Sequence, residues 1–165
     1  MANTLQKPAP AKKKDPSGQP SMKWYDFLKD LGLYLYAVVM ALIGCVTISG
    51  LVNPQAVEQL KLLGAEYLIT VDMISCVLQF ALAAYAVLIR FALAKKKAKA
   101  PLLLVLLHGA DIVVNLALLL IRMDAADMLG QQVDLVSSIL PIVVGGALVV
   151  INLIYFHKRK ALFQN

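Results

Sequence analysis

Five polar side chains interrupt long apolar segments of this 165-residue chain: Asp72, Gln79, His108, Asp111 and Asn115. His108 precedes Asp111 by three residues and Asn115 by seven, so on a helix the three share one face. An imidazole titrates near neutral pH, and a carboxyl group one helical turn away could exchange a proton with it. The residue types therefore allow proton or cation transfer as well as a purely structural network.

Two interpretations of this candidate intramembrane polar network remain open. In the first, each polar group hydrogen-bonds to a neighbouring helix, which contributes about 0.6 kcal/mol per bond in a membrane. In the second, Asp111 exchanges a proton with His108 and Asp72 serves the outer side, in a homodimer or larger assembly. Antiparallel helices would place Gln79 near the level of Asp111, and Asp72 nearer Asn115 and the outer end.

The elements that must position these residues follow from composition. Of all residues 60% are apolar and 16% are charged, and the mean hydropathy is +0.74. A soluble domain is about half apolar and a quarter charged. Four apolar segments can each cross a hydrocarbon core of about 30 Å. We therefore predict an all-α integral membrane four-helix bundle over residues 23–157, with spans at residues 31–52, 67–89, 101–121 and 135–156.

The segments outside the spans are distinct in composition. Residues 1–22 are rich in Ala, Lys and Pro, which predicts a disordered basic tail, and residues 158–165 form a second basic tail. A short amphipathic turn is expected at the membrane interface, because its apolar residues recur at helical spacing: Trp24, Phe27, Leu28 and Leu31. The loop at residues 53–66 is expected to hold a short helix on the membrane, and residues 122–134 form an acidic loop.

Charge placement predicts the orientation. Fourteen of the sixteen Lys and Arg residues lie in the N-terminal segment before the first span, in the turn at residues 90–99 or in the C-terminal tail. Only Lys61 and Arg122 lie in the other two loops. The positive-inside rule then places both termini in the cytoplasm, which requires an even number of spans. We expect a multi-pass protein of the cell membrane.

Small residues indicate where helices approach closely. Ala37, Ala41, Cys45 and Ser49 recur every four residues in the first span, and Gly145 and Gly146 lie in the fourth. Such residues allow close helix contact in a bilayer. The preferred hypothesis is a non-enzymatic accessory or scaffold protein that assembles with itself or with other membrane proteins. The alternative is an oligomeric proton- or cation-coupled transporter or channel that uses Asp111, His108 and Asp72.

Enzymatic signatures are absent from the sequence. It contains no HExxH, GxSxG or CxxC motif and no glycine-rich phosphate loop. Cys45 and Cys76 both lie in apolar segments and are too few for a zinc site, so neither a metal nor another cofactor is expected. Nucleic acid is not an expected partner either, because the basic runs lack interleaved aromatic residues and flank membrane spans.

Three segments carry a resemblance to a known group of proteins: WYDFL at residues 24–28, IRFALAKKKAKAP at residues 89–101 and NLIYFHKRKALFQN at residues 152–165. They resemble uncharacterised small four-span membrane proteins of Clostridia and related Firmicutes. The resemblance covers residues 23–165 and is most specific over residues 158–163. It implies a bacterial four-span architecture and no particular activity. Cysteine-rich extensions occur in related proteins, but this chain has no such cysteines, so no zinc role carries over.

Overall fold

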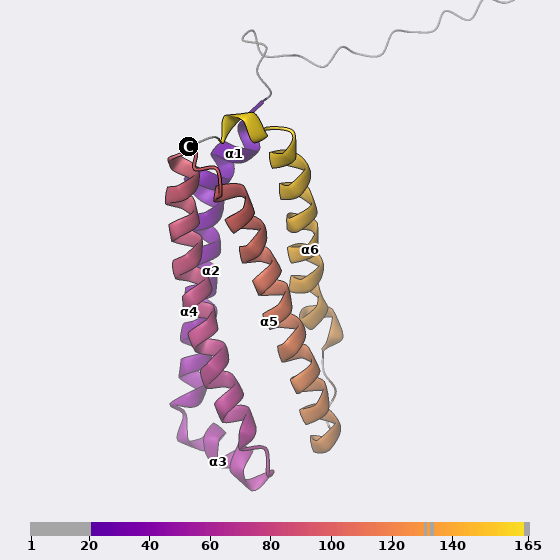
Figure 1. Cartoon of the computed structure of the whole chain (residues 1–165). Helices are drawn as coiled ribbons and strands as arrows, with labels where there is room; N and C mark the ends of the chain where they lie inside the picture. Colours follow the sequence, from indigo (N-terminus) through magenta and orange to yellow (C-terminus); the bar gives the residue numbers. More distant parts are fainter. Residues whose placement is uncertain (1–20, 131, 133, 164–165) are drawn as a thin grey trace, which may run out of the picture.

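The computed structural model describes residues 21–130, 132 and 134–163, and their regular structure is entirely helical (Figure 1). The predicted tail at residues 1–22 lies outside the described residues except for its last two. The elements in order are α1 (Lys23–Phe27), the π-helical turn η1 (Leu28–Gly32), α2 (Leu33–Leu51), α3 (Pro54–Leu62), α4 (Tyr67–Ala94), α5 (Ala100–Leu129), α6 (Leu135–His157) and the 3-10 turn η2 (Lys160–Leu162). The predicted all-α bundle is confirmed.

Four helical segments are long and apolar enough to cross a membrane: Lys23–Leu51, Tyr67–Ala94, Ala100–Met128 and Leu135–His157. The shortest has 23 residues and reaches about 35 Å at about 1.5 Å per residue, more than a hydrocarbon core requires. Large apolar side chains are exposed along all four. These features indicate a multi-pass membrane protein.

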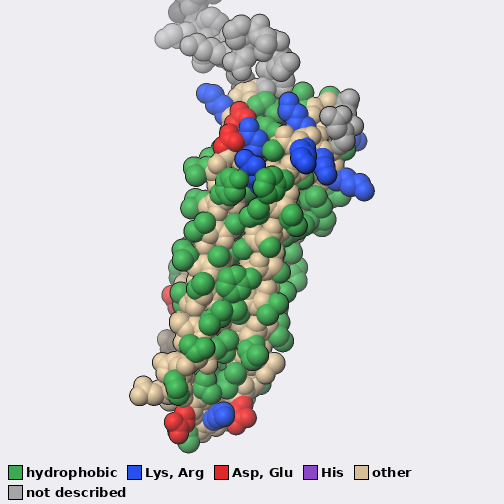
Figure 2. Space-filling model, turned by 90° about the vertical axis from the view of Figure 1, so that its left-hand side faces the viewer, with side chains coloured by type: hydrophobic (Ala, Val, Ile, Leu, Met, Phe, Trp, Pro, Cys, Tyr) green, Lys and Arg blue, Asp and Glu red, His purple; other side chains and the backbone are tan. Residues whose placement is uncertain are grey.

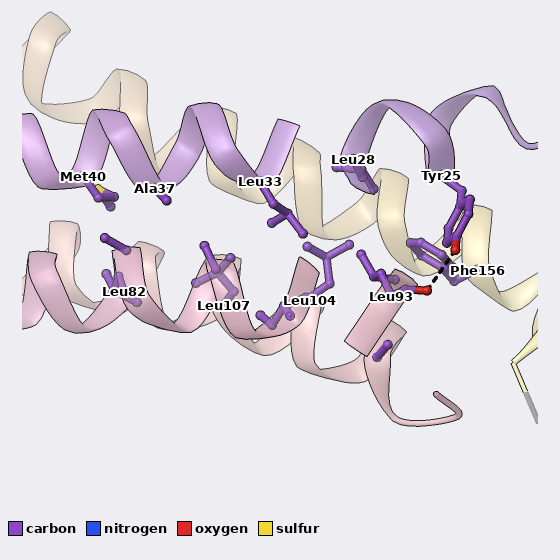
Figure 3. Close-up of a cluster of buried hydrophobic side chains, with 14 of the residues drawn as sticks. Tyr25, Leu28, Leu33, Ala37, Met40, Leu82, Leu93, Leu104, Leu107 and Phe156 are labelled. Atoms are coloured by element: carbon purple, nitrogen blue, oxygen red, sulfur yellow. Dashed lines mark hydrogen bonds between the residues drawn. The ribbon is translucent and has the colours of Figure 1, made fainter. Parts of the chain in front are cut away.

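The four long helices form two antiparallel pairs. α2 packs along α4, α6 packs along α5, and the pairs meet where α4 contacts α5 (Figure 1). Figure 3 shows side chains of α2 pointing toward those of α4 and α5 in the main apolar cluster. The most buried large members of this cluster are Leu33, Ile89, Leu93, Leu104 and Leu107.

The start of the first span differs from the predicted interfacial turn. α1 continues through η1 into α2 without a break, so residues 23–51 form one helix. The wide π turn shifts the helical phase, and Leu28 and Leu33, five residues apart, are both buried. Trp24 is half-buried, whereas Phe27 and Leu31 are exposed. The four expected residues therefore do not form one membrane-facing stripe.

The connections are set by local capping. The predicted short helix is present as α3, with Pro54 at its first turn and the Asn53 side chain accepting from the Gln55 amide at 3.1 Å. The acidic loop is shorter than expected, because α5 continues past Arg122 to Leu129 and carries Asp124 and Asp127 on the helix. Gly130 ends α5 in the left-handed conformation, at φ 62°.

Most basic residues of the described chain lie at one end of the bundle, which we call the basic end. They are Lys23 in α1, Lys29 in η1, Arg90, the lysines of residues 95–99, and residues 158–160. On the face drawn in Figure 2, most Lys and Arg side chains lie at this end of the bundle. The two ends of the described chain also meet here, because Arg159 Nη2 donates to the Ser21 carbonyl at 2.7 Å. Ser21 and Arg159 therefore lie on the same side of any membrane that the bundle crosses.

Candidate functional site

A cluster of four polar side chains lies inside the bundle, contributed by α2 and α5. Tyr36 comes from α2, and His108, Asp111 and Asn115 come from one face of α5. His108 is 4% exposed and Asp111 8% exposed. Asn115 Nδ2 donates to Asp111 Oδ1 at 2.9 Å and to the Asp111 carbonyl at 2.8 Å. The predicted grouping of three residues on α5 is thus realised, with a tyrosine added.

Tyr36 joins the cluster across the helix interface. Its ring meets the His108 ring edge-on, with centroids 5.8 Å apart and planes at 90°. Its hydroxyl faces the Asp111 carboxyl group without reaching hydrogen-bond geometry. Within the described part of the chain, neither His108 nitrogen nor the Tyr36 hydroxyl has a hydrogen-bond partner. Buried polar groups are normally paired, so this cluster has capacity for a proton, a water molecule or a ligand atom.

The close approach of α6 to α5 depends on Gly145. A Cβ at this position would lie 2.9 Å from Ile112 Cγ1 and 3.9 Å from the His108 carbonyl oxygen. Gly145 therefore packs against α5 of its own chain. Gly146, by contrast, would place a Cβ in open space. Of the two glycines proposed for helix packing, only Gly145 has atoms of the described helices within 4 Å of where a Cβ would lie.

Gln79 lies in a separate network between α2 and α4. Thr47 Oγ1 lies 3.4 Å from Gln79 Oε1, and its single hydrogen is shared with the nearer Ile43 carbonyl at 3.0 Å. Gln79 Nε2 donates to Ser75 Oγ at 3.3 Å. Cys76 Sγ donates to the Gly44 carbonyl at 3.7 Å. This network links two helices, as the structural interpretation requires. The hydrogen bonds of the α5 cluster, in contrast, remain within α5.

Asp72 is not part of either network. It is half-buried on α4, and the charge that acts on it is that of Arg122 on α5. Asn115, near which it was expected, instead bonds to Asp111. The structure thus brings together three of the five predicted residues and leaves Asp72 and Gln79 at other sites.

A small cavity of about 160 Å³ leads from Asn115 toward the end opposite the basic end. It lies between α5 and α6, and its polar lining is supplied by Asn115, Arg122, Ser137 and Ser138. Because Asn115 is bonded to Asp111, the cavity is one residue away from the buried carboxyl group. The guanidinium of Arg122 disfavours a metal cation in this cavity.

The expected ridge on α2 is only partly covered by the chain's own helices. Ala37 is buried and Ala41 is half-buried, but Cys45 and Ser49 are exposed. α2 packs through a neighbouring face that shares Ala37 with the ridge, and its buried residues there are Leu33, Ala37, Met40 and Gly44. A Cβ at Gly44 would lie 2.9 Å from Phe80 Cε2, so a larger residue here would have to displace the Phe80 ring.

Sequence reasoning missed Tyr36, Gly44 and the pair Trp24–Asn152. Trp24 Nε1 donates to Asn152 Oδ1 at 2.9 Å, which ties α1 to α6. Asn152 is completely buried, yet its Nδ2 has no partner among the described residues. A lone amide in an apolar span was a usable signal for a buried partner, but nothing in the sequence identified Trp24 as that partner.

Comparison of the chain with protein-family models, curated proteins and solved structures finds no match. Across residues 21–130, 132 and 134–163, no three His, Cys, Asp or Glu side chains lie close enough together to hold a metal ion.

Proposed function

We propose that this chain is a non-enzymatic, multi-pass protein of the cell membrane that acts by assembling with further copies of itself or with another membrane protein. The basic end faces the cytoplasm, in agreement with the positive-inside rule. The observation that carries the proposal is the uncovered part of the α2 ridge: Ala41 is half-buried, and Cys45 and Ser49 are exposed. Small side chains allow the backbone of another helix to come close, which is the main source of helix association in lipid.

Cys45 provides a direct test of assembly. In a Cys76→Ala variant, oxidative or bismaleimide cross-linking in native membranes should join Cys45 to a second copy or to another protein. The matched control moves the thiol to the opposite flank of α2 by combining Cys45→Ala with Ile43→Cys, since Ile43 is also exposed at similar depth. Cross-linking of the control to the same extent as Cys45 would contradict an interface at this ridge.

A second candidate function is a proton path, favoured by the unpartnered groups around His108. The His108 ring and the Tyr36 hydroxyl have no partner among the described residues, and the polar cavity approaches Asp111 through Asn115. A histidine beside a carboxyl group in a membrane span is the kind of pair that relays protons. In this function, Asp111 and His108 exchange the proton, and Asp72 serves the end opposite the basic end.

Proton flux into liposomes tests this second candidate. Asp111→Asn should abolish a flux seen with the wild type, while the assembly stays intact. Gln79→Leu is the control, because Gln79 belongs to the separate α2–α4 network and its loss should leave the flux unchanged. Absence of any flux in the wild-type protein would end the proton-path proposal without affecting the assembly proposal.

A further inference from the structure

A groove of about 610 Å³ opens at the basic end between α5 and α6. Its walls are apolar and come from the first turns of α5 and the last turns of α6, including Pro101, Leu102, Val105, Leu153 and Phe156. This volume lies in the range of sites that bind small organic ligands, about 300–1,000 Å³. Because α5 and α6 are spans, the walls lie at the depth where acyl chains meet lipid headgroups.

The rim of the groove is positively charged. Lys158 and Lys160, both exposed, lie at its mouth together with His157, and no acidic residue is among the described residues that line it. Lysines at this depth extend their ammonium groups toward the headgroup region while their methylene stems cover apolar surface. The groove thus pairs an apolar wall with a cationic rim.

The floor adds one polar group. Asn152 lines the groove and is completely buried, and its Oδ1 is already bonded to Trp24. Its Nδ2 donor has no acceptor among the described residues. The carbonyl oxygen of a ligand that displaces the side chains covering Asn152 would satisfy this donor, whereas a hydrocarbon chain alone would not.

We propose that this groove binds an anionic glycerophospholipid of the leaflet at the basic end. The phosphate group lies against Lys158 and Lys160, an ester carbonyl approaches Asn152, and the upper part of an acyl chain follows the α5–α6 walls. Charge complementarity identifies this occupant. A second copy of the chain seated in the same groove would bring two lysine-bearing rims together, and that like-charge contact opposes association.

The single tryptophan reports on the groove, because Trp24 is bonded to the residue at its floor. The full chain is reconstituted in phosphatidylcholine vesicles that contain brominated phosphatidylglycerol or, in parallel, brominated phosphatidylcholine, and quenching of Trp24 is measured. Brominated phosphatidylglycerol should quench more strongly at equal mole fraction. The ratio of the apparent affinities for the two lipids, obtained from this quenching, is the preference for the anionic lipid. In the combined Lys158→Gln and Lys160→Gln variant this preference should fall roughly tenfold, since each interfacial lysine contributes to the attraction of anionic lipid.

The matched control is the combined variant Lys95→Gln and Lys97→Gln, which removes the same charge from the basic end at two residues that do not line the groove. It should keep the preference within about twofold. Both substituted pairs are exposed, so the fold should persist, and circular dichroism checks it. Equal quenching by the two lipids in the wild type, or an equal loss in both variants, would overturn the proposal.

Discussion

The buried polar cluster combines three neighbouring residues of α5 with one tyrosine from α2. His108, Asp111 and Asn115 lie together because residues three and four apart on a helix are neighbours. Tyr36 was missed because an aromatic residue in an apolar span looks like any other core residue. Its position depends on how α2 packs on α4, and the buried residues of α2 include Leu33, Ala37 and Gly44.

Substitution at Gly44 tests the contact between α2 and α4. Gly44→Leu should lower the free energy of unfolding by about 1–3 kcal/mol, because the new side chain would collide with Phe80. Gly50→Leu is the control, since a Cβ at Gly50 meets nothing within 4 Å. Denaturant titration in detergent micelles measures both. Equal stability of the two variants would show that Gly44 is not needed for close packing.

Loss of Gln79 tests the structural network. Gln79→Leu removes one interhelical contact, to Thr47 on α2, and one bond within α4, to Ser75. Stability should fall by about 0.6 kcal/mol, the average for a single interhelical bond in a membrane. The same titration measures this change. A loss several times larger would mean that Gln79 also supports the α5 cluster, contrary to the separation seen in the structure.

At the scale of the elements, the number and order of the long helices were predictable from the apolar segments, but two boundaries were not. α5 runs beyond Arg122 because residues 123–129, MDAADML, are mostly good helix formers, and Gly130 provides the stop. Their acidic residues suggested a loop, although charge alone does not end a helix. The π turn η1 has no sequence signature, and it follows α1, which bonds to Leu93 of α4 and to Asn152 of α6.

Docking of α1 is tested through Tyr25. Its hydroxyl donates to the Leu93 carbonyl at 2.8 Å, so Tyr25→Phe should lower stability by about 0.5–1.5 kcal/mol and speed hydrogen exchange across residues 23–32. Tyr34→Phe is a suitable control because Tyr34 is exposed. Unchanged exchange in Tyr25→Phe would indicate that apolar packing alone holds α1 in place.

The start of α6 should depend on pH through Asp134. Hydrogen bonds from Ser137 and Val136 lower the pKa of Asp134 below its usual value. Asp134 is the N-cap residue of α6. Its ionised side chain therefore stabilises α6 fully above the unfolded-state pKa, about 3.9, and this contribution is lost as the pH falls through the lower folded-state pKa. The amide resonances of Val136 and Ser137 should titrate with a midpoint below 3.9, and Asp134→Asn should remove the titration. A midpoint at or above 3.9 would contradict the cap.

For the whole molecule, composition predicted the class, and the arrangement of the helices required the structure. The sequence indicated four spans, but not that they form two pairs that meet along α4 and α5. That arrangement leaves part of the α2 ridge exposed and forms the groove at the basic end. Both surfaces depend on how side chains from distant segments pack, which periodicity along the chain does not specify.

The most direct test of the account is the membrane topology of the intact chain. In a Cys45→Ala and Cys76→Ala background, single cysteines are introduced at Glu58 on α3, at Lys97 and at Lys160, all exposed. A membrane-impermeant maleimide applied to intact cells should label Glu58→Cys, and should label Lys97→Cys and Lys160→Cys only after permeabilisation. Labelling of Glu58→Cys and Lys97→Cys from the same side would contradict the multi-pass arrangement.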